Sequence, residues 1–208
     1  MHLFPSAQFR SRVLLAPGQA REFELVADGL AHSEDGVLLP RDWDEEAGYS
    51  VGLRSLPGDA AYALPQLGDG GREQYLAVPE PLRAELEQVA ARFAAPDPAE
   101  PDMTRIARVL QYLRTGYRYE LGVDMALGTD PVLQFLNEHR RGHCELFAAA
   151  AVLLLRVQGV PARYVTGFVC AERHPRADYW LARLKHAHAW AEVYLEGVGW
   201  TPVDPAPE

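Results

Sequence analysis

One thiol stands at the start of the most apolar stretch of the chain. Cys144 follows the polar turn 140–143 and precedes ten apolar residues, 146–155, before Gly159 and Pro161 end the segment. If a helix begins at this cysteine, its unpaired N–H groups, its dipole and the basic side chains of the turn all favour the thiolate. The thiolate is the nucleophilic form, so the sequence predicts a reactive thiol. The ordinary alternative is an inert cysteine packed as a small apolar side chain.

A thiolate nucleophile needs a base within hydrogen-bond reach and a third group, usually a carboxylate, that orients the base. The downstream side chains that could serve are His174, His186, His188, Asp178 and Asp204. From residue 188 to 195 polar and apolar residues alternate, which predicts a strand with His188 on its polar face. The hairpin that follows therefore decides which histidine and which acid can meet.

Two turns are compatible with this hairpin. A three-residue turn at 195–197, with a left-handed glycine at its end, pairs His188 directly opposite Asp204. A two-residue turn at 197–198 instead moves these two side chains apart by about three residues along the strands. The predicted hydrogen bond between the His188 ring and the Asp204 carboxylate therefore depends on the first turn.

Two rivals stay open at this point. His186 lies one step further out on the same strand face as His188 and is the rival base, and Asp178 is the rival orienting acid. A zinc site from Cys144, His186 and His188 would have suitable ligand types, but no paired cysteine spacing accompanies them. We therefore predict no metal site.

The segments that must position these residues change character near residue 76. Residues 1–75 predict a small β region, and residues 76–208 predict the domain that holds the site. In the β region strands are predicted at 7–15, 21–26, 37–39 and 49–53, with a flexible link at 68–71. Beyond it helices are predicted at 81–93, 102–115, from 130 and from 144, an extended segment at 117–120, and strands at 162–170, 179–183, 188–195 and 199–204. Helices followed by an antiparallel sheet predict an α+β fold.

Composition bounds the class of protein. The 208 residues fit one domain, or one domain with a small companion, and 48% of them are hydrophobic, which is enough for a core. The net charge of −9 argues against a nucleic-acid surface. Two cysteines make no disulfide framework, and we expect the second, Cys170, to lie in the core. The sequence predicts neither a signal peptide nor a transmembrane segment.

Three blocks of sequence occur in the order that one family shows. They are GHCELFA at 142–148 with its continuation to 168, HAWAEV at 188–193, and GWTPVDP at 199–205. On these motifs the chain resembles the transglutaminase-like superfamily of cysteine enzymes. The helices from Pro79 resemble its bacterial branch, which includes domains carried on the outer face of inner-membrane proteins.

The resemblance implies a papain-like fold, in which a central helix carries the cysteine and packs on an antiparallel sheet. It implies a triad of Cys144 as nucleophile, His188 as base and acid, and Asp204 as orienting carboxylate. Trp190 and Glu192 share the polar strand face with His188, and we expect them to support the site or to contact substrate.

Two further expectations concern the neighbours of the triad. The oxyanion of an acyl-transfer reaction would meet the backbone N–H of Cys144, and Tyr119 is the candidate for the second donor. Arg163 is expected to form a structural ion pair or hydrogen bond.

Together these features predict cysteine-dependent acyl transfer on peptide or protein carboxamides through a thioester, as a transglutaminase or as a protease or amidase. A catalytically silent binding module on the same fold is the alternative. We expect no cofactor, since no Asp-rich calcium loop is present. The expected partner is a peptide or protein substrate, and the oligomeric state is left open. The domain faces the periplasm if it belongs to a membrane-anchored parent protein, and is cytoplasmic otherwise.

Overall fold

The computed structural model describes residues 2–3, 20–25, 27–32, 38–42, 49–53, 67, 69–94, 97, 99–170, 172–177 and 179–207. Packing divides the chain into two units, residues 1–62 and 63–208. This division falls thirteen residues before the boundary expected at 75/76, because the first helix packs within the second unit.

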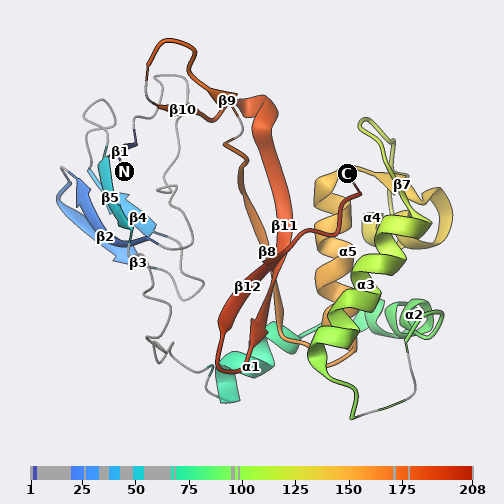
Figure 1. Ribbon diagram of the computed structural model, residues 1–208. Coiled ribbons are helices and arrows are strands. Elements are labelled where there is room, and N and C mark those ends of the chain that lie inside the picture. Colours follow the sequence, from blue (N-terminus) through green and yellow to red (C-terminus); the bar gives the residue numbers. More distant parts are fainter. Residues whose placement is uncertain are drawn as a thin grey trace. The chain divides into compact units, whose positions relative to one another are not determined.

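The first unit consists of short antiparallel strands (Figure 1). They are β1 (His2–Leu3), β2 (Ala20–Leu25), β3 (Gly29–His32), β4 (Leu38–Arg41) and β5 (Tyr49–Leu53). The strands β1, β5 and β2 form one sheet in that order, and β3 pairs with β4. The predicted strands at 21–26, 37–39 and 49–53 are confirmed, whereas β3 was not predicted and 7–15 lies outside the described residues.

The second unit begins with helices. These are α1 (Asp69–Leu76), α2 (Glu80–Ala90), α3 (Asp102–Gly116), α4 (Pro131–Gln134), a π-helical turn (Phe135–His139) and α5 (Cys144–Val157). The flexible link expected at 68–71 is wrong for residues 69–71, which belong to α1. Tyr75 of this helix is buried and its ring packs at 4.6 Å from that of Trp200, so tertiary packing outweighs the glycines.

A three-stranded antiparallel sheet follows the helices. It contains β8 (Ala162–Phe168), β11 (Ala187–Leu195) and β12 (Gly199–Val203), in the order β12-β11-β8. Between β8 and β11 lie the hairpin of β9 (Glu172–Arg173) with β10 (Trp180–Leu181) and a 3₁₀ turn (Leu184–His186). The predicted α+β architecture is confirmed.

Helix α5 is the centre of this unit. Figure 1 shows it between the sheet and the helices α3 and α4, which explains why it is apolar on every side. The helix ends as expected: Gly159 has φ +82°, and the N–H of Val160 donates to the carbonyl of Leu155 at 3.0 Å. The polar turn before α5 and the strand start of β11 are thereby held at fixed positions on one core.

Candidate active site

Cys144 is the first residue of α5 and is 9% exposed. It packs with Ala148 of the same helix and Ala189 of β11, two small side chains that let the helix start approach the strand. The expectation that the thiol opens the central helix is confirmed. A thiol here lies at the end of the helix where the backbone N–H groups and the dipole attract negative charge.

The residues before the cysteine are held by a short strand pair. The strand β6 (Arg118–Tyr119) runs parallel to β7 (Arg141–Gly142), with Tyr119 paired to Gly142. A side chain at Gly142 would have its Cβ 2.7 Å from Cδ1 of Leu146 and 3.1 Å from the Phe135 ring. Only glycine therefore allows the turn to pass this close to the core before α5 begins.

His188 and Asp204 form a hydrogen bond, as the sequence predicted. Nε2 of His188 lies 2.6 Å from Oδ2 of Asp204. The other carboxylate oxygen, Oδ1, accepts the N–H of Ala206 at 3.0 Å, and the guanidinium of Arg114 donates to the Asp204 carbonyl. The acid is thus held at its carboxylate and at its backbone.

The turn that brings this pair together is not the predicted one. Leu195 pairs with Gly199, so the turn is 196–198 and Asp204 continues the register toward Trp190 rather than directly opposite His188. The half-buried Leu195 packs against the core, which keeps it in the strand. The contact survives because the register changes by two residues, which preserves the strand face and leaves His188 as a diagonal neighbour.

The thiol lies close to the His188–Asp204 pair, because Cys144 packs against Ala189, the residue next to His188. Since β12 is antiparallel to β11, Asp204 after β12 lies near the start of β11, where Cys144 packs against Ala189. Burial, the largest cause, and the neighbouring Cys144 thiol raise the pKa of Tyr119, and the charge of Asp204 raises it further. The Tyr119 hydroxyl therefore lies close enough to both Cys144 and Asp204 for each of them to affect its pKa.

Tyr119, the weakest of the sequence candidates, occupies this central place. Its ring stacks on Phe147 of α5 with the centroids 6.3 Å apart. The nearby backbone N–H of Cys144 lowers the pKa of Tyr119, but this effect is outweighed by those that raise it. The hydroxyl consequently lies beside the N–H that we expect to bind an oxyanion.

The side chains of Trp190 and Glu192 differ in what they touch. The Trp190 ring lies nearly parallel to that of His188 with centroids 6.3 Å apart, and it covers Gly167 so closely that a Cβ there would lie 2.8 Å from the indole. Glu192 instead pairs with Arg163, whose guanidinium lies 2.6 Å from Oε2 of Glu192. The structural ion pair expected for Arg163 is present.

The rival base belongs to a different network. Nδ1 of His186 accepts the N–H of Arg183 at 3.2 Å, and its Nε2 lies 4.0 Å from Glu172. A hydrogen bond from the Arg183 side chain, the largest cause, lowers the pKa of Glu172 to about 2. His186 therefore belongs to the loop before β11, while the rival acid, Asp178, lies outside the described residues.

Sequence reasoning missed two neighbours and misplaced one. Arg114, in the last turn of α3, donates a hydrogen bond to the Asp204 carbonyl, which lies 90 residues further along the chain. No local sequence pattern predicts this contact. Tyr164 of β8 is close enough to the thiol that burial and the charges of Glu145 and Cys144 raise the pKa of Tyr164. The prediction that Cys170 is a core residue is wrong: it follows the end of β8 and is exposed.

Within the described ranges, no group of three or more His, Cys, Asp or Glu side chains could hold a metal ion. In that same part of the chain, no helix has the length and apolar character needed to cross a bilayer.

A cysteine at the start of a central helix, packed on an antiparallel sheet that carries a His–Asp pair, is the arrangement of the papain-like fold class. The sequence model of the transglutaminase-like superfamily matches residues 87–205, more than half of the chain. The chain therefore belongs to the transglutaminase-like superfamily.

Individual relatives agree with this assignment. A protein-glutamine gamma-glutamyltransferase from Pseudomonas aeruginosa is 36% identical over 107 residues, which are 51% of this chain and 16% of that protein. The uncharacterized protein YebA from Bacillus subtilis is 38% identical over 80 residues, 36% of this chain and 11% of that protein. The chain thus spans a small part of the length of these relatives.

Solved structures show the same fold over almost all of the chain. The periplasmic domain of TgpA from Pseudomonas aeruginosa, bound to ethylmercury, matches with a TM-score of 0.69 at 27% identity. The match covers 97% of this chain and 68% of the TgpA chain. A putative cysteine protease from Cytophaga hutchinsonii matches with a TM-score of 0.52 at 16% identity. That match covers 98% of this chain and 70% of the protease chain. The second likeness concerns the fold alone.

Proposed function

We propose that this protein catalyses cysteine-dependent acyl transfer on peptide or protein carboxamides, with Cys144, His188 and Asp204 as its catalytic triad. The observation that carries the proposal is the 2.6 Å hydrogen bond between His188 and Asp204 at the end of the unit where Cys144 begins α5. A catalytically silent protein of this fold would not need this hydrogen-bonded pair, whereas a thiolate nucleophile needs an oriented imidazole.

The two ring nitrogens of His188 have different tasks in this mechanism. Because Nε2 is bonded to Asp204, the other nitrogen, Nδ1, is the atom that takes the thiol proton. The thiolate of Cys144 then attacks the carboxamide carbonyl, and the tetrahedral intermediate expels ammonia after His188 returns the proton. The resulting thioester passes its acyl group to an amine or to water.

The negative oxygen of the intermediate needs two donors. The backbone N–H of Cys144 is one, and the Tyr119 hydroxyl beside it is the second. Because the pKa of Tyr119 is raised, the hydroxyl keeps its proton near neutral pH and can donate it to the oxyanion.

The acceptor distinguishes a transglutaminase from a protease or amidase that uses the same triad. The name of the Pseudomonas aeruginosa relative supports a glutamine side chain as acyl donor and an amine as acceptor. We therefore propose transfer to amines, with hydrolysis as the competing outcome. We also propose that the chain is a domain of a longer, membrane-anchored protein; the periplasmic location of the TgpA domain supports the periplasm as its compartment.

Alkylation of the two cysteines tests the nucleophile. Cys170 is exposed and Cys144 is 9% exposed, so simple access predicts faster modification of Cys170. The triad predicts the reverse, and iodoacetamide labelling with peptide mapping decides between them. Mass spectrometry of the protein with a glutamine peptide should then show the thioester on Cys144. If Cys170 reacts faster and no thioester forms, the chain is the silent binding module instead.

A further inference from the structure

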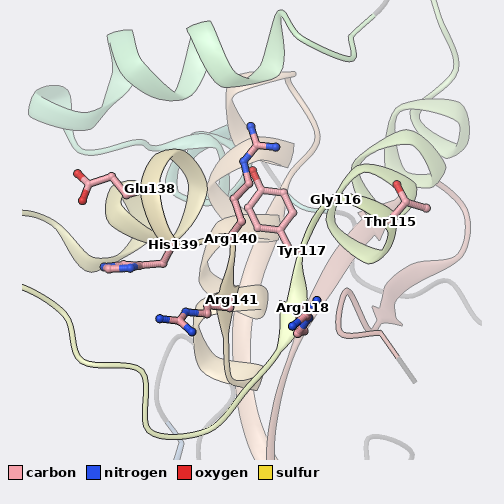
Figure 2. Close-up of a pocket in the computed structure, with 8 residues that line it drawn as sticks. All are labelled: Thr115, Gly116, Tyr117, Arg118, Glu138, His139, Arg140 and Arg141. Atoms are coloured by element: carbon pink, nitrogen blue, oxygen red, sulfur yellow. The ribbon is translucent and has the colours of Figure 1, made fainter.

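A pocket of about 590 Å³ opens beside the strands that lead to the thiol. It is lined by Thr115, Gly116, Tyr117, Arg118, Glu138, His139, Arg140 and Arg141 (Figure 2). The lining contains three arginines and a single carboxylate, although the whole chain carries a net charge of −9. We call it the arginine pocket.

The arginines of this pocket are set on a rigid backbone. Arg118 and Arg141 are paired across β6 and β7, and the N–H of Arg118 donates to the carbonyl of Arg140 at 2.9 Å. Figure 2 shows the Arg140 side chain rising beside the buried Tyr117 ring. The backbone pairing thus places two positively charged residues side by side on this short strand pair.

Arg140 has a backbone conformation that is unfavourable for an arginine. It ends the π-helical turn with φ +51° and ψ +26°, a left-handed conformation that glycine or asparagine adopts most readily. π-Helical turns occur often at functional sites. An arginine kept in this conformation indicates that its charge at this point has a use.

Only one of the three arginines of the pocket forms an ion pair with a carboxylate of the described residues. Arg141 lies 3.3 Å from Glu120, an ion pair between two partly exposed side chains. Among the residues that the structure describes, no carboxylate pairs with Arg118 or Arg140. Two guanidinium groups are therefore available to an anion, and guanidinium binds carboxylates through paired hydrogen bonds.

The place of the pocket connects it to the reaction. Arg141 precedes Cys144 by three residues, so the two lie within roughly 10 Å along the chain. An extended peptide covers this distance in about three residues. A peptide whose carboxamide reaches the thiol therefore brings a side chain about three positions away to the pocket.

We propose that the arginine pocket is a subsite for an acidic side chain of the protein substrate, about three residues from the carboxamide on which Cys144 acts. This inference rests on the proposed function. The volume of the arginine pocket exceeds what a single inorganic anion needs, and it suits an acidic side chain together with part of its peptide backbone.

Direct binding tests the subsite without turnover. Fluorescein-labelled peptides of about ten residues would carry a central glutamine and either aspartate or asparagine three positions away on each side. Fluorescence anisotropy with the full chain carrying Cys144→Ala should give a Kd at least about tenfold lower for the aspartate peptide. Arg118→Gln and Arg140→Gln should each reduce this preference, whereas the control Arg83→Gln, an exposed arginine of α2, should keep it.

Several results would overturn the subsite. These are equal affinities for the two peptides, an unchanged preference in Arg118→Gln when circular dichroism shows a native fold, or tight binding of inorganic phosphate with no preference between the peptides. Amine incorporation into the asparagine peptide by the unsubstituted protein tests the proposed function separately. Activity without charge preference removes only the subsite, and charge preference without activity removes only the acyl-transfer mechanism.

Discussion

The thiol and the His188–Asp204 pair reach the same end of the second unit by different physical means. Cys144 is positioned mainly by packing: Gly142 and the core side chains of α5 lie within a few residues of it, and the β6·β7 pair adds a contact to residues 118–119. The pair instead depends on strand register over a 16-residue separation and on an arginine 90 residues away. The nucleophile should therefore be sensitive to packing, and the base to hydrogen bonds between distant segments.

The largest effect should come from the histidines. His188→Ala removes the proposed base and should lower the rate of amine incorporation by up to about 10⁶-fold, as loss of a triad histidine does in a serine protease. His186→Ala, the matched control two residues away, removes only the contacts to Arg183 and Glu172 and should stay within a few-fold. Equal losses in two variants of native circular dichroism would mean that the base has been assigned wrongly.

Asp204→Asn should have the next largest effect. An amide in place of the carboxylate no longer fixes the imidazole tautomer or stabilises its cation, and the analogous change in a serine protease costs about 10⁴ in kcat. Single-turnover acylation measures it. Asp102→Asn, an acid of α3 that pairs with Arg105, serves as control. A loss below about tenfold for Asp204→Asn would show that the acid does not orient the base.

Tyr119→Phe separates the oxyanion contact from the packing of the ring. The phenyl ring can keep its stacking on Phe147, so the fold should hold, while loss of one donor should lower kcat by about 10²- to 10³-fold with little change in KM. Tyr179→Phe removes a hydroxyl from a ring stacked on His174 in the outer hairpin and should leave the rate unchanged. If Tyr119→Phe raises KM and spares kcat, the hydroxyl binds substrate instead.

Gly142→Ala tests the packing that sets the thiol. The added Cβ would lie 2.7 Å from Leu146, so the free energy of unfolding should fall by about 1–3 kcal/mol. Gly116→Ala meets nothing within 4 Å and is the matched control. Urea unfolding of both variants measures the difference, and similar stabilities would show that the turn before α5 relaxes freely.

Much of the site could be read from residue order, because its elements are local. The apolar run after Cys144 predicts a buried helix, and Asp130 predicts the cap that it forms with the N–H groups of Val132 and Leu133. The alternation from His188 to Leu195 predicts the strand and its faces. In each case the physical cause lies within one or two turns of chain, where periodicity and capping chemistry act.

The tertiary structure alone decided the remaining features. The turn at 196–198 follows from the packing of Leu195 in the core, and the fold of 69–76 as a helix follows from the burial of Tyr75. Contacts such as Arg114 with Asp204 join segments whose separation no periodicity records. The sequence determined which groups could do chemistry, and long-range packing determined which of them meet.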